Sequence, residues 1–592
     1  MQPAQARATV RTATLRGAML MLFSLCLFTS MACTQMTTCS SWVKNGLKVG
    51  PEYCRPSAPL EPQWIDMQSE PRLIDETADI ANWWRQLGDP TLNGLIEMAY
   101  AQNLTIRQAG TRIQQAEAIR GIAVGNLFPQ VQQAVGDIQS IRTSENIAVP
   151  SPVRRFGQHD LGMQAGWELD FWGRFRRSVE VADAQLDASI AGYDEITVLL
   201  LANVAASYVE IRTVQERLQI ARTIIEFQQG SLAIAQARYA ANQTNKLDVL
   251  QAQNNIDVTQ AAIPALESQL RMANNRLCVL LGIPPQDLVA ELSPGSIPTV
   301  SRSVQVGVPA DLLRRRPDVR RTERLMKAQS EQIGIAEAEL YPHISLVGSF
   351  EWEAESSDDL FDSGSIFGLI GPGFSWNVLN YGRLRNGIEF EQQRFRESVY
   401  NYQQTVLTAQ QEVEDAMIGF LKAQEQADEL ADAVAQVNEA EKIAETLYQT
   451  GATDFNRVFV IQAFQFAQQD DLVVSRASVV FNLINLYKSL GGGWQIRCPT
   501  GQDNVPLAAY SDQADGGMIG EIPEIEEDDS RSDIGVEPKN PSDAPPTTTA
   551  PPKSTQPENQ RLKELLDADV NDKPSSPSDD QQRLKELLEQ DL

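Results

Sequence analysis

Residues 167–174 read Trp-Glu-Leu-Asp-Phe-Trp-Gly-Arg, and residues 376–383 read Trp-Asn-Val-Leu-Asn-Tyr-Gly-Arg. Upstream, Phe128-Pro129 matches Tyr341-Pro342 at an offset of 213 residues rather than 209. The second copy is therefore four residues shorter between the proline and the tryptophan, as expected of an exposed loop tip. This tandem duplication is too long for a solenoid repeat. The residues matched at an offset of 209 are Trp167, Gly173, Arg174, Val204, Tyr239, Leu281 and Gly282 with Trp376, Gly382, Arg383, Val413, Tyr448, Leu490 and Gly491.

Each copy has the pattern of a helix, a strand pair and a long helical hairpin. Proline and glycine end the helices because neither continues an α-helix well. The hairpins are interrupted by short polar segments. The expected ranges are a helix over about 92–126, strands over 130–171 and a hairpin over 174–282 broken at 242–245, then a helix up to Leu340, strands over 343–379 and a hairpin over 383–490 broken at Gly451.

The long helices carry a weak coiled-coil seam. Apolar residues recur with 3-4-3-4 spacing, which lets helices pack along one stripe. Most other faces are polar, which indicates helices with water on two sides. Taken alone, this pattern favours a two-helix hairpin that packs on itself. The seam consists of Leu201, Val204, Tyr208, Ile211, Gln215 and Leu218, matched by Gln410, Val413, Met417, Phe420, Gln424 and Ala427.

Each expected strand is long enough to cross an outer membrane when tilted, and aromatic residues crowd the strand ends as in barrel girdles. Four strands cannot close a barrel, and an open edge cannot face lipid. The strands are therefore expected to be shared between subunits. The alternative is a soluble four-stranded sheet that caps a helical bundle. The aromatic residues are Trp167, Phe171 and Trp172 in copy one, and Phe350, Trp352, Phe374 and Trp376 in copy two.

The N-terminus reads as an export signal with a basic start and an apolar run over 18–29, too short for a permanent membrane span. Ala32-Cys33 resembles a lipoprotein cleavage site, which makes Cys33 a candidate for lipidation. Ser30 departs from that pattern, and ordinary cleavage nearby is the alternative. No later stretch is expected to form a transmembrane helix.

The cysteines suit an exported protein. Cys278 is expected to be a core thiol. Cys39, Cys54 and Cys498 could pair in an oxidising compartment, but the sequence leaves their connectivity open. No metal spacing, Ser-His-Asp arrangement or phosphate loop occurs, so we expect no catalytic site, no metal site, no cofactor and no enzyme activity. The two histidines, His159 and His343, are expected at matching places in the strands of the two copies.

The net charge of −28 argues against nucleic-acid binding. Residues 511–592 contain 21 acidic and 8 basic residues among many Pro, Ser and Thr, and are expected to be disordered. The heptapeptide Gln-Arg-Leu-Lys-Glu-Leu-Leu occurs at 560–566 and again at 582–588. Each copy could form two turns of helix on a partner, and a solvated tail without a partner is the alternative.

Several motifs, in this order, resemble the TolC family of outer-membrane efflux proteins, in particular its OprM/NodT-like lipoprotein branch. The resemblance covers nearly the whole chain outside the signal and the tail. Cys54 and the long tail depart from it. The motifs lie at Val49–Pro56, Trp83-Trp84, Asp89–Leu92, Asn103-Leu104, Trp167–Arg174, Pro309–Val319 and Leu490–Trp494.

The resemblance implies a mainly α fold with a small membrane β-barrel. Duplicated helical hairpins would form a periplasmic α-barrel, and three chains of four strands would form a 12-stranded outer-membrane barrel. It also implies a homotrimer in outer-membrane lipid that acts as a passive exit duct for small molecules or metal ions. A periplasmic adaptor and a proton-driven or ATP-driven inner-membrane pump would be its partners. The expected division is signal 1–32, extended segment 33–91, repeat 92–285, linker 286–308, repeat 309–494 and tail 495–592.

In this family the periplasmic tip is closed by polar links between helix hairpins, which would lie at the two hairpin breaks. By family position, Asp248 would hydrogen-bond Tyr448 or pair with Arg457 across neighbouring hairpins. A solvated carboxylate at a helix start is the alternative for Asp248. The full set of expected gate residues is Tyr239, Thr244, Asp248, Tyr448, Thr453, Asp454 and Arg457.

Two other functions stay open at this point. One is an outer-membrane duct for type I protein secretion with an ATP-driven exporter. The other is a periplasmic scaffold that binds through its coiled coils and conducts nothing.

Overall fold

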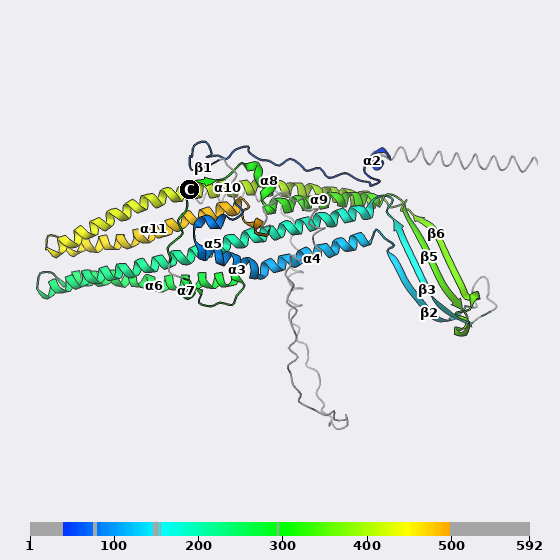
Figure 1. The fold of residues 1–592 in the computed structure, drawn as a ribbon, viewed down its shortest axis with the longest axis horizontal. Helices are drawn as coiled ribbons and strands as arrows, with labels where there is room; N and C mark the ends of the chain where they lie inside the picture. The colour runs from blue at the N-terminus through cyan, green and yellow to red at the C-terminus, as the bar shows by residue number, and fades with distance from the viewer. Residues whose placement is uncertain are drawn as a thin grey trace, which may run out of the picture. The chain divides into compact units, whose positions relative to one another are not determined.

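The computed structural model describes residues 39–74, 80–144, 146, 153, 155–292 and 295–497. All of them belong to one compact unit. Within this unit the long helices run side by side, with a β-sheet at one end and two helix turns at the other (Figure 1). The expected signal, Cys33 and the tail heptapeptides lie outside the described residues.

Copy one contains two short helices, two strands and a long helical hairpin. The elements are α3 (Pro90–Gln102), α4 (Leu104–Gly125), β2 (Val131–Arg142), β3 (Arg155–Leu169), α5 (Arg174–Ala240) and α6 (Lys246–Leu281).

Copy two repeats this order. Its elements are η2 (Pro309–Asp311), α8 (Leu312–Arg315), α9 (Pro317–Ala338), β5 (His343–Ala354), β6 (Ile366–Ser375), α10 (Arg383–Gln449) and α11 (Phe455–Ser489), with η3 (Ser357–Asp359) and η4 (Ser363–Ser365) between the strands.

The remaining elements are short and flank the two copies. A pair of two-residue strands, β1 and β4, joins the N-terminal segment to the linker between the copies in parallel. The sequence patterns did not predict this pair. The short elements are α2 (Cys39–Lys44), β1 (Leu73–Ile74), η1 (Trp83–Leu87), α7 (Leu288–Glu291), β4 (Val304–Gln305) and η5 (Trp494–Arg497).

The duplication is visible in matching backbone details. Helices α5 and α10 are both 67 residues long, and both are preceded by a glycine with positive φ, Gly173 at 84° and Gly382 at 83°. Trp167 Nε1 donates to the Leu127 carbonyl at 3.1 Å, and Trp376 Nε1 donates to the Leu340 carbonyl at 2.9 Å. The two copies therefore share the same turn between helix, strand and long helix.

The helices form a layer with two open edges. In the half near the sheet, α4 packs on α5, α5 on α9, and α9 on α10. In the other half, α6 packs on α5, α5 on α11, and α11 on α10. The expected seam lies in this packing, because Leu201, Val204, Tyr208 and Ile211 are fully buried in the main core. Cys278 is buried there too, as predicted.

The four long strands form one antiparallel sheet in the order β2-β3-β5-β6. Val131 pairs with Gly166 in the first hairpin, Gly166 with Val347 between the copies, and His343 with Ser375 in the second hairpin. Strands β2 and β6 are the open edges. Because α4 leads into β2 and β6 leads into α10, the open edges of the sheet continue the open edges of the helix layer.

Several expectations need correction. The helix expected over 92–126 is two helices, because the Asn103 side chain caps a new helix by accepting from the Thr105 and Ile106 amides. The second strand pair ends at Ser375, not Leu379. His159 lies inside β3 whereas His343 begins β5, so the histidines do not match between copies. Among the residues that the structure describes, one helix, α5, contains a window apolar enough to cross a membrane, but 72% of that window is buried within the protein.

Candidate functional site

The tip of the helical layer consists of the two turns that join α5 to α6 and α10 to α11. Asn242 and Gly451 have positive φ there, 56° and 80°, which breaks each helix. The Asn245 side chain accepts from the Leu247 amide at 2.8 Å and starts α6. Asp454 starts α11 in the same way. These caps satisfy free backbone N–H groups in the first turn of each returning helix.

One carboxylate joins the two copies at the tip. Asp248, in the first turn of α6, is 8% exposed. Its Oδ2 accepts a hydrogen bond from the Tyr448 hydroxyl at 3.0 Å and another from Thr244 Oγ1. Tyr448 lies at the end of α10 and Asp248 at the start of α6, so this bond connects the turn of one hairpin to the turn of the other. Hydrogen bonds to an ionised acceptor are stronger than neutral ones.

Arg238 holds the same tyrosine from the other side. Its guanidinium carbon lies 4.7 Å from the Tyr448 ring centroid, and its Nη1 donates to the Tyr448 carbonyl. The ring of fully buried Phe455 meets the Tyr448 ring edge-on at 5.1 Å. Tyr448 is therefore fixed by one acid, one cation and one aromatic ring.

Burial and, next, the hydrogen bond to Asp248 and its charge raise the pKa of Tyr448 to about 12, against the opposite effects of Thr244 and Arg238. A raised pKa means that the folded state favours the neutral phenol. Its contribution to stability is present below the ordinary pKa of about 10 and is lost as pH rises toward the folded value. The phenol therefore remains a hydrogen-bond donor throughout the neutral range.

The structure brings together three of the seven expected gate residues: Thr244, Asp248 and Tyr448. Asp454 acts as a helix cap, accepting from the Arg457 amide at 3.3 Å. Tyr239 is 46% exposed and Arg457 is exposed; within the described chain, neither side chain makes an interaction with Asp248. Thr453 is half-buried in the turn.

Sequence reasoning missed Arg238. Its matched residue 209 positions later is Leu447, so this position departs from the internal repeat beside a matched tyrosine. That asymmetry is the signal that could have identified it.

Two further polar links fasten the hairpins to each other above the tip. Gln462 Nε2 donates to Ser231 Oγ at 2.7 Å in the buried interface of α5 and α11. Farther from the tip, Arg217 forms a bidentate ion pair with Asp470, with Nε to Oδ1 at 2.7 Å and Nη2 to Oδ2 at 2.9 Å. Such paired contacts fix orientation as well as proximity.

The four-stranded sheet has two chemically different faces. Side chains alternate between the faces along each strand, and the register aligns them across the sheet. On one face, Gln158 and Gln164 donate to Glu353 and Glu351 of the neighbouring strand. The more polar face carries Gln133, Asp137, Gln139, Gln158, Asp160, Gln164, Ser349, Glu351 and Glu353, together with the apolar Val131, Val135, Ile141, Phe156, Val347, Phe367 and Leu369. The more apolar face carries Ile138, Leu161, Met163, Ile344, Leu346, Phe350, Trp352, Ile366, Ile370 and Phe374, together with the polar Gln132, Ser140, Arg142, Arg155 and His159.

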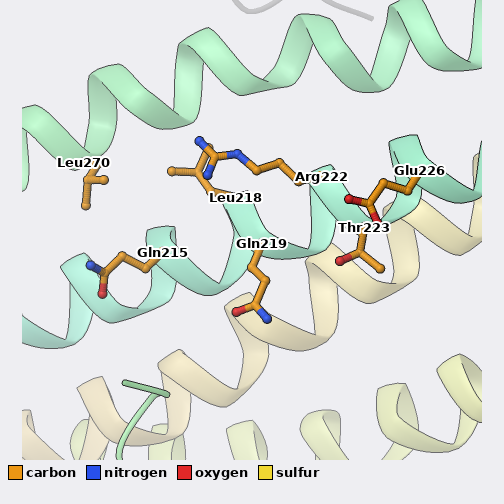
Figure 2. A pocket seen from close by; sticks show the side chains of 7 residues that line it. All are labelled: Gln215, Leu218, Gln219, Arg222, Thr223, Glu226 and Leu270. Carbon is orange, nitrogen blue, oxygen red and sulfur yellow. The ribbon is translucent and has the colours of Figure 1, made fainter. Parts of the chain in front are cut away.

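An open hollow of about 520 Å³ lies beside α5 and α6 (Figure 2). Its lining is mixed, with no convergent set of polar groups. Among the described residues, no group of three or more His, Cys, Asp or Glu side chains could hold a metal ion. The hollow is lined by Gln215, Leu218, Gln219, Arg222, Thr223, Glu226 and Leu270.

Comparison with known families decides the class of the protein. Residues 95–283 and 308–492 match the model of the outer membrane efflux protein family, one segment in each copy. The chain belongs to the outer membrane efflux protein family. Its duplicated helical hairpins and small sheet are the fold of solved channels of this family. The outer-membrane channel OprN covers 76% of this chain and 99% of its own, with a TM-score of 0.71 and 30% identity.

Curated members of the outer membrane efflux protein family are similar over most of their length. The pyoverdine export outer membrane protein OpmQ of Pseudomonas putida is 30% identical over 71% of this chain and 89% of its own. Nodulation protein T of Rhizobium leguminosarum bv. viciae is 28% identical over 75% of this chain and 90% of its own. The cation efflux system protein CusC of Escherichia coli is 28% identical over 78% of this chain and 99% of its own. Two of these names state a cargo, pyoverdine in one case and cations in the other.

Proposed function

We propose that three copies of this chain close into a ring that forms an exit duct through the outer membrane. The observation that carries the proposal is the alignment of open edges: β2 and α4 on one side, β6 and α10 on the other. A head-to-tail contact between unlike edges generates a ring when the rotation closes. Three chains of four strands give about 12 strands, within the range of membrane barrels.

The two faces of the sheet suit such a barrel. Its apolar face would meet lipid and its polar face would line a water-filled lumen, which is the alternation expected of outer-membrane strands. Strands of 10 to 15 residues are long enough to cross a membrane when tilted. Closure would also remove the unpaired edges that lipid cannot satisfy.

The tip would act as the gate of the duct. The bond between Asp248 and Tyr448 ties two hairpins together where the helical layer ends. Three such links around a ring would hold the tip closed, and opening would require breaking them. We assign this role to Thr244, Asp248 and Tyr448, with Tyr239, Thr453, Asp454 and Arg457 available for contacts between neighbouring chains.

The start of the described chain suits a lipid anchor at Cys33. Trp42 lies 5.3 Å from the ring of Phe171 and 5.6 Å from that of Trp172, beside the junction of sheet and helices. Only eight residues separate Cys33 from this aromatic group. Trp and Tyr favour membrane interfaces, so a lipid on Cys33 would enter the leaflet nearest the helices.

A passive duct needs a partner that supplies energy. The relatives support a tripartite arrangement in which an inner-membrane pump, proton-driven or ATP-driven, and a periplasmic adaptor deliver cargo to the tip. Because the relatives are named for a siderophore, a nodulation function and cations, cargo choice would lie largely with the pump. Small molecules or metal ions are the cargo class we propose.

The deciding experiment uses the full chain, extracted from outer membranes in detergent. We expect a particle with the mass of three chains that gives discrete ion conductance in a planar bilayer. A monomer without conductance would leave the periplasmic scaffold as the better account. Cross-linking in intact cells followed by mass spectrometry then separates a pump and adaptor from an ATP-driven protein exporter, the second candidate.

A further inference from the structure

The two faces of the sheet separate the charges of the long strands. The acidic residues of these strands all lie on the more polar face, whereas their two arginines, Arg142 and Arg155, lie on the more apolar face. We infer that these arginines form a binding site for the phosphate of a lipid headgroup in the outer leaflet of the outer membrane. This inference rests on the proposed duct and identifies the lipid chemistry that its barrel recognises. The acidic residues are Asp137, Asp160, Glu168, Glu351 and Glu353.

The arginines face each other across the first hairpin. Arg142 is the last residue of β2, Arg155 is the first residue of β3, and the register pairs them directly. Residues directly opposite each other in such a pair have Cβ atoms about 4.5–5.5 Å apart, and like charges there repel. Both side chains are exposed, and within the described part of the chain neither guanidinium group pairs with a carboxylate. An anion between them would replace this repulsion with two attractions.

The arginine pair lies at the end of the sheet remote from the helices. Strand β2 starts at Val131 after α4, and β3 ends at Leu169 shortly before α5, so the residues of the pair mark the opposite end (Figure 1). If the helices stand in the periplasm, as proposed, this end faces the outside of the cell. The lipid nearest the arginines is then that of the outer leaflet.

The distance of the pair from the apolar band matches a headgroup layer. Ile138 is the last apolar side chain of this face in β2, and it pairs with His159. Ile344 marks the limit near the helices, and it pairs with Leu169. The step from His159 to Leu169 measures about 34 Å along the strand and about 25 Å in height at the usual tilt, which is the height of a lipid-facing band. Arg155 lies about 10 Å higher, and arginine side chains are long enough to reach back toward headgroups.

The row between the arginines and the apolar band contains small residues. Ser140 pairs with Gly157 there. No bulky side chain in this row of β2 and β3 separates the guanidinium groups from Ile138, which is 79% exposed. A lipid would therefore lay an acyl chain on Ile138 and place its phosphate between the guanidinium groups.

Phosphate is the anion that suits this pair. A guanidinium group binds a phosphate through two parallel N–H···O bonds, which the ammonium group of lysine cannot form. A free phosphate ion would satisfy the two charges but would leave Ile138 uncovered. A phosphate carried by a lipid satisfies both, and a cation on the lipid-facing side costs least near the membrane interface.

Binding of lipid A, the bisphosphorylated anchor of lipopolysaccharide, tests the site. The full chain is purified as detergent-extracted trimers, stripped of lipid and titrated with lipid A, while native mass spectrometry counts the bound lipids. The parent should bind one lipid A for each arginine pair. We expect Arg142→Gln with Arg155→Gln to bind lipid A about thirtyfold more weakly, and each single variant about fivefold more weakly.

Matched variants separate this site from a general effect of charge. Arg112→Gln with Arg271→Gln removes the same charge from exposed arginines of α4 and α6, and should bind lipid A like the parent. Arg142→Lys with Arg155→Lys keeps the charge but loses the paired hydrogen bonds, so its affinity should lie between those of the parent and the double glutamine variant. Lipid A without its phosphates should bind the parent no better than the double glutamine variant.

The outcomes separate the lipid site from the duct. If parent trimers form and conduct, but lipid A binds the double glutamine variant as tightly as the parent, the site is wrong and the duct stands. Displacement of lipid A by equimolar inorganic phosphate would assign the arginines to a free ion and overturn the lipid site. If the parent forms no trimer, the proposed duct fails and the lipid site fails with it. Should the double glutamine variant not assemble, the single variants and the phosphate-free lipid provide the same test on intact trimers.

Discussion

At the residue scale, the link between the two hairpins at the tip depends on one oxygen atom, Asp248 Oδ2. Asp248 Oδ2 accepts from both Tyr448 and Thr244, so removing the carboxylate leaves the buried Tyr448 hydroxyl and the half-buried Thr244 hydroxyl without their acceptor. A hydrogen bond to a charged group contributes about 1.5–3 kcal/mol. Asp248→Ala should therefore loosen the tip more than Tyr448→Phe, and the double variant should add little to Asp248→Ala alone. We expect higher conductance in planar bilayers for each variant.

The matched control for the tip is Asp257→Asn, nine residues further along the same helix. Asp257 is exposed and accepts from Gln253 of its own helix, so its loss should leave conductance unchanged. Equal conductance of parent, Asp248→Ala and the double variant would exclude this link as a gate.

A second residue-scale prediction concerns a buried arginine. Arg177 is 1% exposed, pairs with Glu331, and donates to the Val49 carbonyl at 2.6 Å and the Gly50 carbonyl at 3.1 Å. Arg177→Met leaves the buried Glu331 carboxylate without its ion-pair partner and the Val49 carbonyl without the Arg177 donor, while the Gly50 carbonyl keeps the Asn45 Nδ2 donor at 3.3 Å. We expect a loss of about 3–5 kcal/mol of unfolding free energy. Thermal unfolding in detergent measures it.

Limited proteolysis reports the same change locally, because Arg177 holds the N-terminal segment on α5. The segment should be cut faster in Arg177→Met than in the parent. Lys48→Met is the comparison, since its ion pair with half-buried Glu180 is partly exposed and contributes about 0–1 kcal/mol. If Arg177→Met and Lys48→Met lose equal unfolding free energy, burial of the pair between Arg177 and Glu331 adds no stability.

At the element scale, the sequence predicts long helices well and their interruptions poorly. Helices α5 and α10 begin and end as expected, because a glycine precedes each and a polar turn follows. The break at Asn103 was missed because the helical pattern continues through it and the cap depends on side-chain geometry. The strand register could not be predicted either, since a period of two fixes faces but not partners. Within the site, the hydrogen bond between Asp248 and Tyr448 was expected from family position, whereas the contacts of Arg238 with Tyr448 were not.

The break at Asn103 has a testable contribution to stability. Its Oδ1 caps α4, and its Nδ2 donates to the Leu280 carbonyl near the end of α6 at 2.8 Å. Asn103→Ala loses both interactions, whereas Asn103→Asp keeps the cap and loses the donor. We expect Asn103→Ala to cost about 1–2 kcal/mol for the cap, plus the unpaired carbonyl, and Asn103→Ser, which keeps a capping oxygen, to cost less. Asn103→Asp also keeps a capping oxygen but places a buried carboxylate against the Leu280 carbonyl and should cost more than Asn103→Ser. Chemical denaturation compares them, and a larger loss for Asn103→Ser than for Asn103→Ala would contradict the capping role.

At the scale of the whole molecule, the two faces of the sheet decide whether the chain can enter a membrane. Leu369 and Ile370 are neighbours in β6, 57% and 79% exposed, and they lie on opposite faces. If the apolar face meets lipid, Ile370→Lys places a charge there at a cost of up to about 2–4 kcal/mol per chain, or less near the interface. Leu369→Lys places the same charge toward the lumen, where water solvates it.

Because a trimer would contain three copies of each introduced lysine, the two variants should differ strongly in assembly. We expect Ile370→Lys to abolish recovery of detergent-extracted trimers from outer membranes, while Leu369→Lys assembles like the parent chain and shifts only the ion selectivity of the duct. Native mass and reversal potential measure the two effects. Equal assembly of both variants would mean that the sheet does not face lipid on its apolar side. The soluble cap on a helical bundle would then explain the four strands better than a barrel.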